Sequence, residues 1–387
     1  MNRLLLITLL LFLPFYLHAQ PDITDSMNTE RFWKTIIFED HSASMEQPAL
    51  PTGAGNIIVV ASNRILNAGE TRFISEERDK DGRLNYYIVF IKDNSWHVWQ
   101  TNLEAAIASV SNINDDWVIY TEGYGKIFTT GLYRGLNMSM QHHVNVLYLD
   151  YPSYNTGKGT LGNYKFALSN ARQAGHDFAP VLYTIKTYRE AGKMGNGRMT
   201  LFFHSMGNNS IREIVKQELL EPINDKVWVD NLVLNSACVP ERNHAEWIDK
   251  IRFAKRIYIN YNPKDYTLGG AKLVSLTRQL GEGVRGNLSR QAIYVNFNQL
   301  CGRNHSNFIR LLSHYRTPPM ALAYYRVVLH GKKVNVKDSA SFTVSNYRKL
   351  GYSILPKQAV QKQPEEMDAG VSEDGHSNSG GASTMFH

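Results

Sequence analysis

Three residues with the chemistry of acyl transfer follow three separate apolar runs of the sequence. They are Ser205, Asp265 and His305, and the runs span 199–203, 256–261 and 292–297. A serine hydroxyl is a weak nucleophile at neutral pH, so it needs a base within hydrogen-bond reach and a carboxylate that orients this base. The order serine, acid, histidine along the chain predicts Ser205 as nucleophile, His305 as general base and Asp265 as its orienting partner.

The sequence around Ser205 has the form of a strand that runs into a sharp turn and then into a helix. The apolar run is followed by His-Ser-Met-Gly-Asn at 204–208 and by an amphipathic pattern. Such a turn holds the serine oxygen clear of the sheet, Gly207 lets the helix approach closely, and the amide of Met206 can point at an oxyanion. Phe203 departs from the G-x-S-x-G pattern, and an ordinary helix N-cap serine is the alternative interpretation.

The partners of the serine also have alternative interpretations. Asp265 could be a simple turn residue. His305 could be a surface histidine, with His314 as the rival base, although the stretch 308–315 that contains His314 looks helical. His204 projects the wrong way along the turn to act as the base, so we expect it to face the core or to line the site.

An earlier glycine-rich segment is the expected source of a second oxyanion donor. The apolar run 117–121 leads into Gly123, Tyr124 and Gly125, which suits the Tyr124 amide to approach the serine. A plain glycine turn is the alternative. The polar segment 151–162 is the best candidate for a loop at the edge of the site.

The elements that must position these residues alternate along the chain. Strands are expected at 56–60, 86–91, 117–120, 144–149, 199–203, 232–234, 256–261 and 292–297, and helices at 178–188, 211–219 and 320–329. This alternation predicts an α/β fold with a mainly parallel, doubly wound sheet and helices on both faces. The turn at 79–83 predicts that strand 86–91 returns antiparallel to its predecessor. The candidate residues then lie at the carboxyl ends of strands, where open α/β sheets bind ligands.

These motifs resemble the α/β-hydrolase superfamily, and most closely its bacterial branch of hydrolases of unknown function. That branch pairs an H-G-Y-N loop with an A-H-S-M-G-N elbow. Here 204–208 match the elbow, 123–124 match the loop core, and 61–64 resemble an early strand segment of the branch. The resemblance covers roughly residues 55 to 330 and implies the α/β-hydrolase fold.

The resemblance also implies the same serine, aspartate and histidine as a catalytic triad, with the amides of the two glycine-bearing turns as oxyanion donors. Two residues depart from the pattern, because Glu122 stands where the branch has His and Gly125 where it has Asn. A carboxylate at 122 would oppose negative charge in the transition state, unless it points away to a cation such as Lys126 or Arg134.

Two classes of function follow. The first is a serine hydrolase that acts on a carboxylic ester or thioester of a small molecule or lipid through an acyl-enzyme. The second, suggested by Glu122 and Phe203, is a catalytically impaired binding or envelope-scaffold protein that keeps the fold. No cofactor is expected, since a phosphate-binding glycine loop is absent from the sequence. No metal is expected either, because the adjacent His142 and His143 would point to opposite faces of a strand.

The ends of the chain differ in composition from its middle. A short positive region and an apolar run predict a signal peptide at 1–19, with an uncleaved membrane anchor as the alternative. A lead-in at 20–54, the hydrolase domain at 55–356 and a disordered tail at 357–387 follow. The expected location is therefore the periplasm or the exterior, without a later transmembrane span. The net charge of +7 comes from scattered basic residues, so no nucleic-acid partner is expected.

The chain has two cysteines, Cys238 and Cys301. An oxidising compartment would permit a disulfide between them, and two buried free thiols are the alternative.

Overall fold

The computed structural model describes residues 25–43, 48–311, 317–345 and 351–356. The expected signal peptide at 1–19, the expected tail at 357–387 and the rival base His314 lie outside these ranges. Among the described helices, none combines the length and the apolar character that crossing a bilayer requires.

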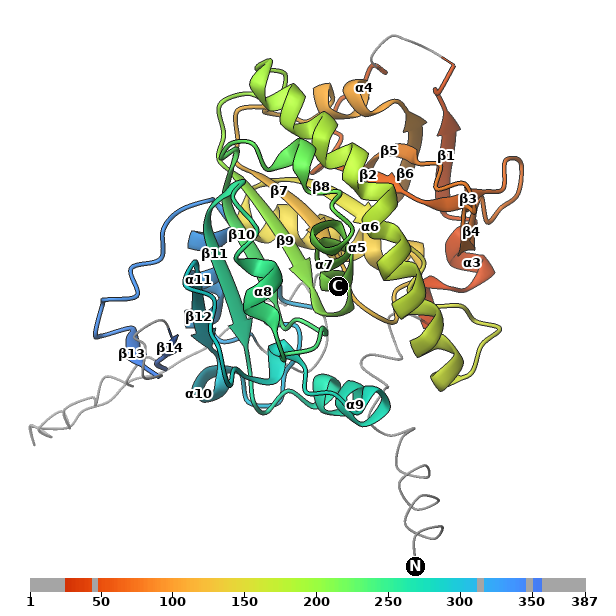
Figure 1. Cartoon of the computed structure of the whole chain (residues 1–387). Helices are drawn as coiled ribbons and strands as arrows, with labels where there is room; N and C mark the ends of the chain where they lie inside the picture. Colours follow the sequence, from red (N-terminus) through yellow and green to blue (C-terminus); the bar gives the residue numbers. More distant parts are fainter. Residues whose placement is uncertain (1–24, 44–47, 312–316, 346–350, 357–387) are drawn as a thin grey trace, which may run out of the picture. The chain divides into compact units, whose positions relative to one another are not determined.

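Twelve strands form one sheet (Figure 1), in the order β1-β6-β5-β2-β8-β7-β9-β10-β11-β12-β14-β13. Their bounds are β1 Ile36–Asp40, β2 Ile58–Ser62, β5 Asn85–Lys92, β6 Ser95–Thr101, β7 Trp117–Thr121, β8 Asn145–Asp150, β9 Met199–His204, β10 Val229–Asn235, β11 Ala254–Tyr261, β12 Ala292–Asn296, β13 Phe342–Val344 and β14 Gly351–Ile354. Strands β3 (Arg64–Leu66) and β4 (Ile74–Arg78) pair separately. From β2 to β14 all neighbours in the large sheet are parallel, so the sheet is mainly parallel.

Helices cover both faces of the sheet, which makes the chain an α/β protein. Buried side chains form two clusters, one on each face. The first face carries α4 (Leu103–Ala108), α6 (Thr160–Glu190), α7 (Asn208–Lys216), α8 (His244–Ile248) and α9 (Tyr266–Ser275). The second carries α3 (Glu30–Trp33), α5 (Phe128–His142), α10 (Asn298–Cys301) and α11 (Pro319–Leu329).

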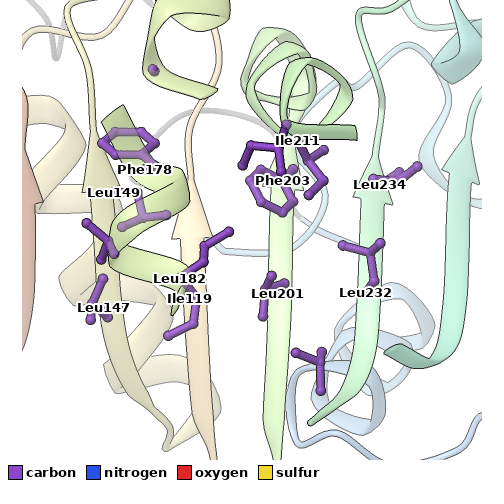
Figure 2. Packing of buried hydrophobic residues seen from close by; sticks show 14 of the residues in the cluster. Ile119, Leu147, Leu149, Phe178, Leu182, Leu201, Phe203, Ile211, Leu232 and Leu234 are labelled. Carbon is purple, nitrogen blue, oxygen red and sulfur yellow. The ribbon is translucent and has the colours of Figure 1, made fainter. Parts of the chain in front are cut away.

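The alternation of side chains along β9 shows why both faces are covered. Leu201 and Phe203 belong to the first cluster, whereas Phe202 between them belongs to the second. Figure 2 shows Phe203 against Ile211 of α7, and Leu182 of α6 beside the neighbouring strand β7. A strand buried on both faces is therefore apolar at most positions, and full burial of each apolar side chain contributes about 1.5–3 kcal/mol.

The strands expected from the sequence are present, with ends that differ from the expected ones by no more than three residues. The antiparallel return is confirmed, since β5 pairs antiparallel with β2. Strand β1 was not expected; it lies within the segment taken as a lead-in and pairs with β6. Two expectations were wrong: residues 308–311 are not helical, and residues 160–162 of the expected loop belong to α6, which leaves 151–159 as the loop.

The interpretation of His142 and His143 as strand residues was also wrong. His142 ends α5, and His143 caps it in a left-handed conformation. The His142 Nε2 atom lies 2.6 Å from the carbonyl oxygen of Phe308, so this ring ties α5 to the segment after His305. Among the described residues, no three His, Cys, Asp or Glu side chains are grouped as metal ligands.

The two cysteines are both free and buried. Cys238 belongs to the cluster on the first face and Cys301 to the cluster on the second. The sheet therefore separates them, and the possibility of a disulfide is excluded in this fold.

The order of the strands determines where a site can form. From β7 the chain passes through α5 to β8 on one side, and through α6 it returns to β9 on the other side of β7. The connections thus diverge at the carboxyl ends of β7 and β9. A crevice opens at such a switch point, and it is the usual ligand site of an open α/β sheet.

Candidate active site

Ser205 lies at the turn between β9 and α7 in a strained backbone conformation. Its φ is +52°, which places a non-glycine residue in the left-handed region. The turn is tight because Gly207 packs on the end of β7: a Cβ at this glycine would lie 2.4 Å from the carbonyl oxygen of Glu122. Strain of this kind persists only where the surroundings enforce it, and it typically marks a functional residue.

Asp265 and His305 meet in a short hydrogen bond. His305 Nδ1 lies 2.6 Å from Asp265 Oδ2, and the carboxylate is fully buried. The other oxygen, Oδ1, accepts a hydrogen bond of 3.1 Å from the amide of Leu268, so Asp265 also caps α9. Asn262 holds the histidine loop by donating to the carbonyl of Gly302 at 2.9 Å. With a proton on Nδ1, the Nε2 atom of His305 is left to act as an acceptor.

The segment after β10 connects the serine to the histidine. The Cys238 amide donates to the carbonyl of Ser205 at 3.0 Å, and the Ser236 hydroxyl donates to the carbonyl of His305 at 3.2 Å. The rings of His204 and His305 are 4.7 Å apart. Among the described residues, the Ser205 hydroxyl makes no direct hydrogen bond to His305. Such bonds are often long in a site without ligand and shorten when substrate binds.

The loop after β7 lies directly against the serine. A Cβ built on Gly123 would lie 2.5 Å from Ser205 Cβ, 3.0 Å from Ser205 Oγ and 3.2 Å from the Met206 nitrogen. The Gly123 amide itself donates to Glu122 Oε1 at 2.9 Å. Within the described part of the chain, the amides of Tyr124 and Met206 donate to no protein acceptor. These two amides therefore remain available to an oxyanion.

Glu122 is fully buried, and both of its carboxylate oxygens have hydrogen-bond partners within the protein. Its Oε2 accepts short hydrogen bonds from the Tyr120 hydroxyl and from Arg134 Nε. Burial alone would raise the pKa of Glu122, but the charge of Arg134 outweighs it and holds this pKa well below its ordinary value. The carboxylate is therefore ionised and neutralised by a partner within the core.

His204 belongs to the same buried network. Its Nδ1 lies 3.1 Å from Asn235 Nδ2, which can only donate, so the ring proton is on Nε2. That Nε2 faces Ser306 Oγ at 3.3 Å and Glu122 Oε1 at 3.5 Å. Burial lowers the pKa of His204 well below its ordinary value, so the ring is neutral. His204 thus supports the site from behind and does not reach the serine as a base.

Arg134 joins the loop after β7 to the loop that carries His305. Besides Glu122, it donates through Nη2 to Ser306 Oγ at 3.1 Å, and its guanidinium lies over the Phe308 ring. Ser306 directly follows His305. Sequence reasoning named Arg134 only as one possible partner of Glu122 and missed Ser306 altogether, since the two are separated by 172 positions.

A second buried arginine, Arg64, also holds the segment that follows β7. Arg64 pairs with Asp150, with Nε and Oδ2 2.8 Å apart, and donates to the carbonyls of Lys126 and Tyr151. Ser153 of the expected site-edging loop accepts from the Gly125 amide at 3.1 Å. The signal in the sequence was the position of Arg64, a charged residue two positions after the end of the buried strand β2.

The structure thus brings together the candidate site residues that lie within its described part. Ser205, Met206 and Gly207 come from the β9–α7 turn, Glu122, Gly123 and Tyr124 from the loop after β7, Asp265 from the end of β11 and His305 from the loop after β12. The chemistry that this arrangement permits is nucleophilic attack by a hydroxyl beside free backbone amides.

Comparisons with solved structures found distant likenesses. A carboxyl esterase from the fungus Tuber melanosporum is 10% identical, with 76% of this chain and 89% of that chain covered and a TM-score of 0.34. An ester hydrolase from the Lake Arreo metagenome is 9% identical, with 64% and 79% covered and a TM-score of 0.31. An esterase of Pyrobaculum calidifontis is 14% identical, with 56% and 72% covered and a TM-score of 0.28. No curated protein matches the chain.

A family model decides the assignment. Residues 99–301, just over half of the chain, match the model described as "Alpha/beta hydrolase of unknown function (DUF900)". The matched range contains the loop after β7, Ser205 and Asp265, and it ends four residues before His305. The chain belongs to this family of α/β hydrolases.

Proposed function

We propose that the chain is a serine hydrolase that cleaves a carboxylic ester or thioester through an acyl-enzyme. The observation that carries the proposal is the backbone of Ser205, a non-glycine residue with a φ of +52° whose side chain lies beside Gly123 and the Met206 amide. An ordinary helix N-cap has an extended backbone and needs no such strain.

The proposed reaction has two halves. Ser205 Oγ attacks the acyl carbonyl while His305 Nε2 takes its proton, and the oxyanion receives hydrogen bonds from the amides of Tyr124 and Met206. His305 then gives the proton to the leaving alcohol or thiol as the bond to the acyl carbon breaks. In the second half, water attacks the acyl-enzyme with His305 as base, which releases the acid and restores Ser205. Asp265 keeps the proton on His305 Nδ1 and stabilises the imidazolium.

The alternative of a fold-retaining scaffold loses its main support. It was suggested by Glu122 and Phe203, but the Glu122 carboxylate is paired with Arg134, and the Phe203 side chain is accommodated in the buried cluster on the first face. The expected substrate remains an ester of a small molecule or lipid, and the apolar N-terminal segment 1–19 supports export to the periplasm or the exterior.

The test uses a fluorophosphonate probe, which reacts with an activated serine without knowledge of the substrate. We expect the folded protein to be labelled and Ser205→Ala to lose all labelling. Asp265→Asn should retain the fold but label at least about 100-fold more slowly, because the histidine then takes the wrong tautomer. A folded protein that is not labelled, or a Ser205→Ala variant that is labelled as before, would exclude the proposal.

A further inference from the structure

Helix α9 exposes an apolar stripe to solvent. Tyr266, Leu273 and Leu276 are 43%, 47% and 90% exposed. Tyr266 and Leu273 are seven residues apart and thus lie on one side of the helix, while Leu268 and Ala271 on the opposite side are buried in the core. Leu276 follows as the C-cap of the helix. A helix of a globular protein normally presents polar residues on its outer face, so this stripe needs a separate explanation.

Leu276 is the most exposed large apolar residue of the described chain. It ends α9 with a φ of +52°, in the left-handed region that disfavours leucine. Glycine or asparagine usually occupies this position of a helix end. The chain therefore combines backbone strain and an exposed leucine at the same position.

The segment of the chain that carries the stripe is rich in basic residues. Residues 263–303 contain six basic side chains, Lys264, Lys272, Arg278, Arg285, Arg290 and Arg303. The only acidic ones, Asp265 and Glu282, are both buried. The guanidinium of Arg303 lies 4.1 Å from the ring centroid of Tyr266, directly on the stripe. This segment therefore exposes apolar and basic side chains and no acidic side chain of its own.

We infer that the stripe of Tyr266, Leu273 and Leu276 docks the protein on an anionic lipid bilayer. A basic helix with leucine and tyrosine on its outer face lies in the interface of such a bilayer, where the leucines enter the acyl boundary and the cations meet lipid phosphates. A protein partner of matching shape would need acidic groups around an apolar centre, whereas the bilayer offers both over any area.

The position of α9 gives this docking a consequence for the site. Asp265 is the N-cap of α9 and holds His305, and α9 lies at the carboxyl ends of the strands (Figure 1). A bilayer on this face would present its esters next to the serine. This consequence, an ester held in a membrane as substrate, rests on the proposed function, whereas the docking itself does not.

The docking is tested by co-sedimentation with vesicles of phosphatidylcholine, with and without 30% phosphatidylglycerol, at about 0.1 M salt. All proteins carry Ser205→Ala, so that hydrolysis plays no part. We expect binding to the anionic vesicles, weakening with added salt. Leu273→Asp with Leu276→Asp should weaken it by at least about tenfold, because burial of each leucine is worth more than one tenfold step.

The single variant Leu276→Asp is matched by Val227→Asp, which adds the same one charge at a residue that is 58% exposed and precedes the amino end of β10. Because every variant shares one N-terminus, any difference reports on α9. Binding that is equal in the stripe variant and the control, or absent throughout, overturns the inference. Sedimentation only in the presence of an added protein would overturn it as well and assign the stripe to a protein partner.

A second measurement does not depend on the folding of the aspartate variants. Leu276→Trp places a fluorophore on the stripe, and Val227→Trp places one at the control position. We expect a blue shift of emission with anionic vesicles for the first and none for the second. The same shift in both variants, or in neither, contradicts docking through α9.

Discussion

Glu122 is the residue whose type is least expected in a site that must stabilise negative charge. The structure shows why it is tolerated: Arg134 neutralises it, and its Oε1 accepts the amide of Gly123. The Glu122 carboxylate therefore orients the loop after β7, and Arg134 balances its charge. Arg134 extends this support to Ser306 and so to the loop that carries His305.

Glu122→Gln should lower the free energy of unfolding by about 3 kcal/mol at pH 7, because it leaves the buried Arg134 without its counter-charge. Folding lowers the pKa of Glu122. The stability that the ionised carboxylate contributes is therefore complete above the pKa of the unfolded chain, about 4.3, and is lost as the pH falls toward the lower pKa of the folded protein. The difference between parent and variant should therefore shrink between pH 5 and pH 3. Denaturant unfolding at each pH measures it.

The control is Glu70→Gln, which removes the same charge from an exposed position. It should differ little from the parent at any pH. A gap between Glu122→Gln and the parent that stays constant from pH 7 to pH 3 would show that the carboxylate is not ionised in the fold.

At the scale of elements, two strand ends define the site. The loop after β7 and the turn after β9 touch at Gly123, which has no side chain to separate them. We expect Gly123→Ala to abolish fluorophosphonate labelling, because the new methyl group would occupy the space beside Ser205 Oγ and the Met206 amide. The free energy of unfolding should fall by only about 1–3 kcal/mol, which is the cost of one overpacked methyl group.

Gly159→Ala is the control for this prediction, since no atom lies within 4 Å of the Cβ it would add. It should label like the parent. If Gly123→Ala also labels at the parental rate, the loop after β7 does not form one side of the oxyanion site.

The strands that the sequence predicted most clearly are those buried on both faces of the sheet. Strands β7 to β12 have continuous apolar or aromatic runs, so their presence and order were predictable. Strand β6 was missed because Ser95, His97 and Gln100 interrupt its apolar pattern. Helix α6 was recognised only in its second half, since its first half packs small residues such as Ala167 and Ala171 against the sheet.

The same contrast holds for the site. The serine, the aspartate and the histidine were predictable because each follows a strand in a known order. The network of Glu122, Arg134 and Ser306 was not, because its contacts join three elements whose relative positions exist only in the folded sheet. Side-chain geometry across 172 positions leaves no local pattern to find.

At the scale of the whole molecule, the sheet divides the interior into two separate cores. This division keeps the two thiols apart, with Cys238 on the face of α6 and α7 and Cys301 on the face of α5 and α11. Burial raises the pKa of each thiol to about 12, so neither is a thiolate at neutral pH and both resist oxidation.

Stability should therefore be independent of the redox state of the solution. We expect the same Tm with and without dithiothreitol, and two alkylated cysteines when the protein is unfolded in iodoacetamide without reductant. A native disulfide typically contributes about 2–4 kcal/mol, so its reduction would lower Tm by several degrees. A protein mass two hydrogens below that of the free dithiol, together with a Tm that falls on reduction, would show a disulfide. The two cysteines would then have to meet on one side of the sheet, which would contradict the strand order on which the site depends.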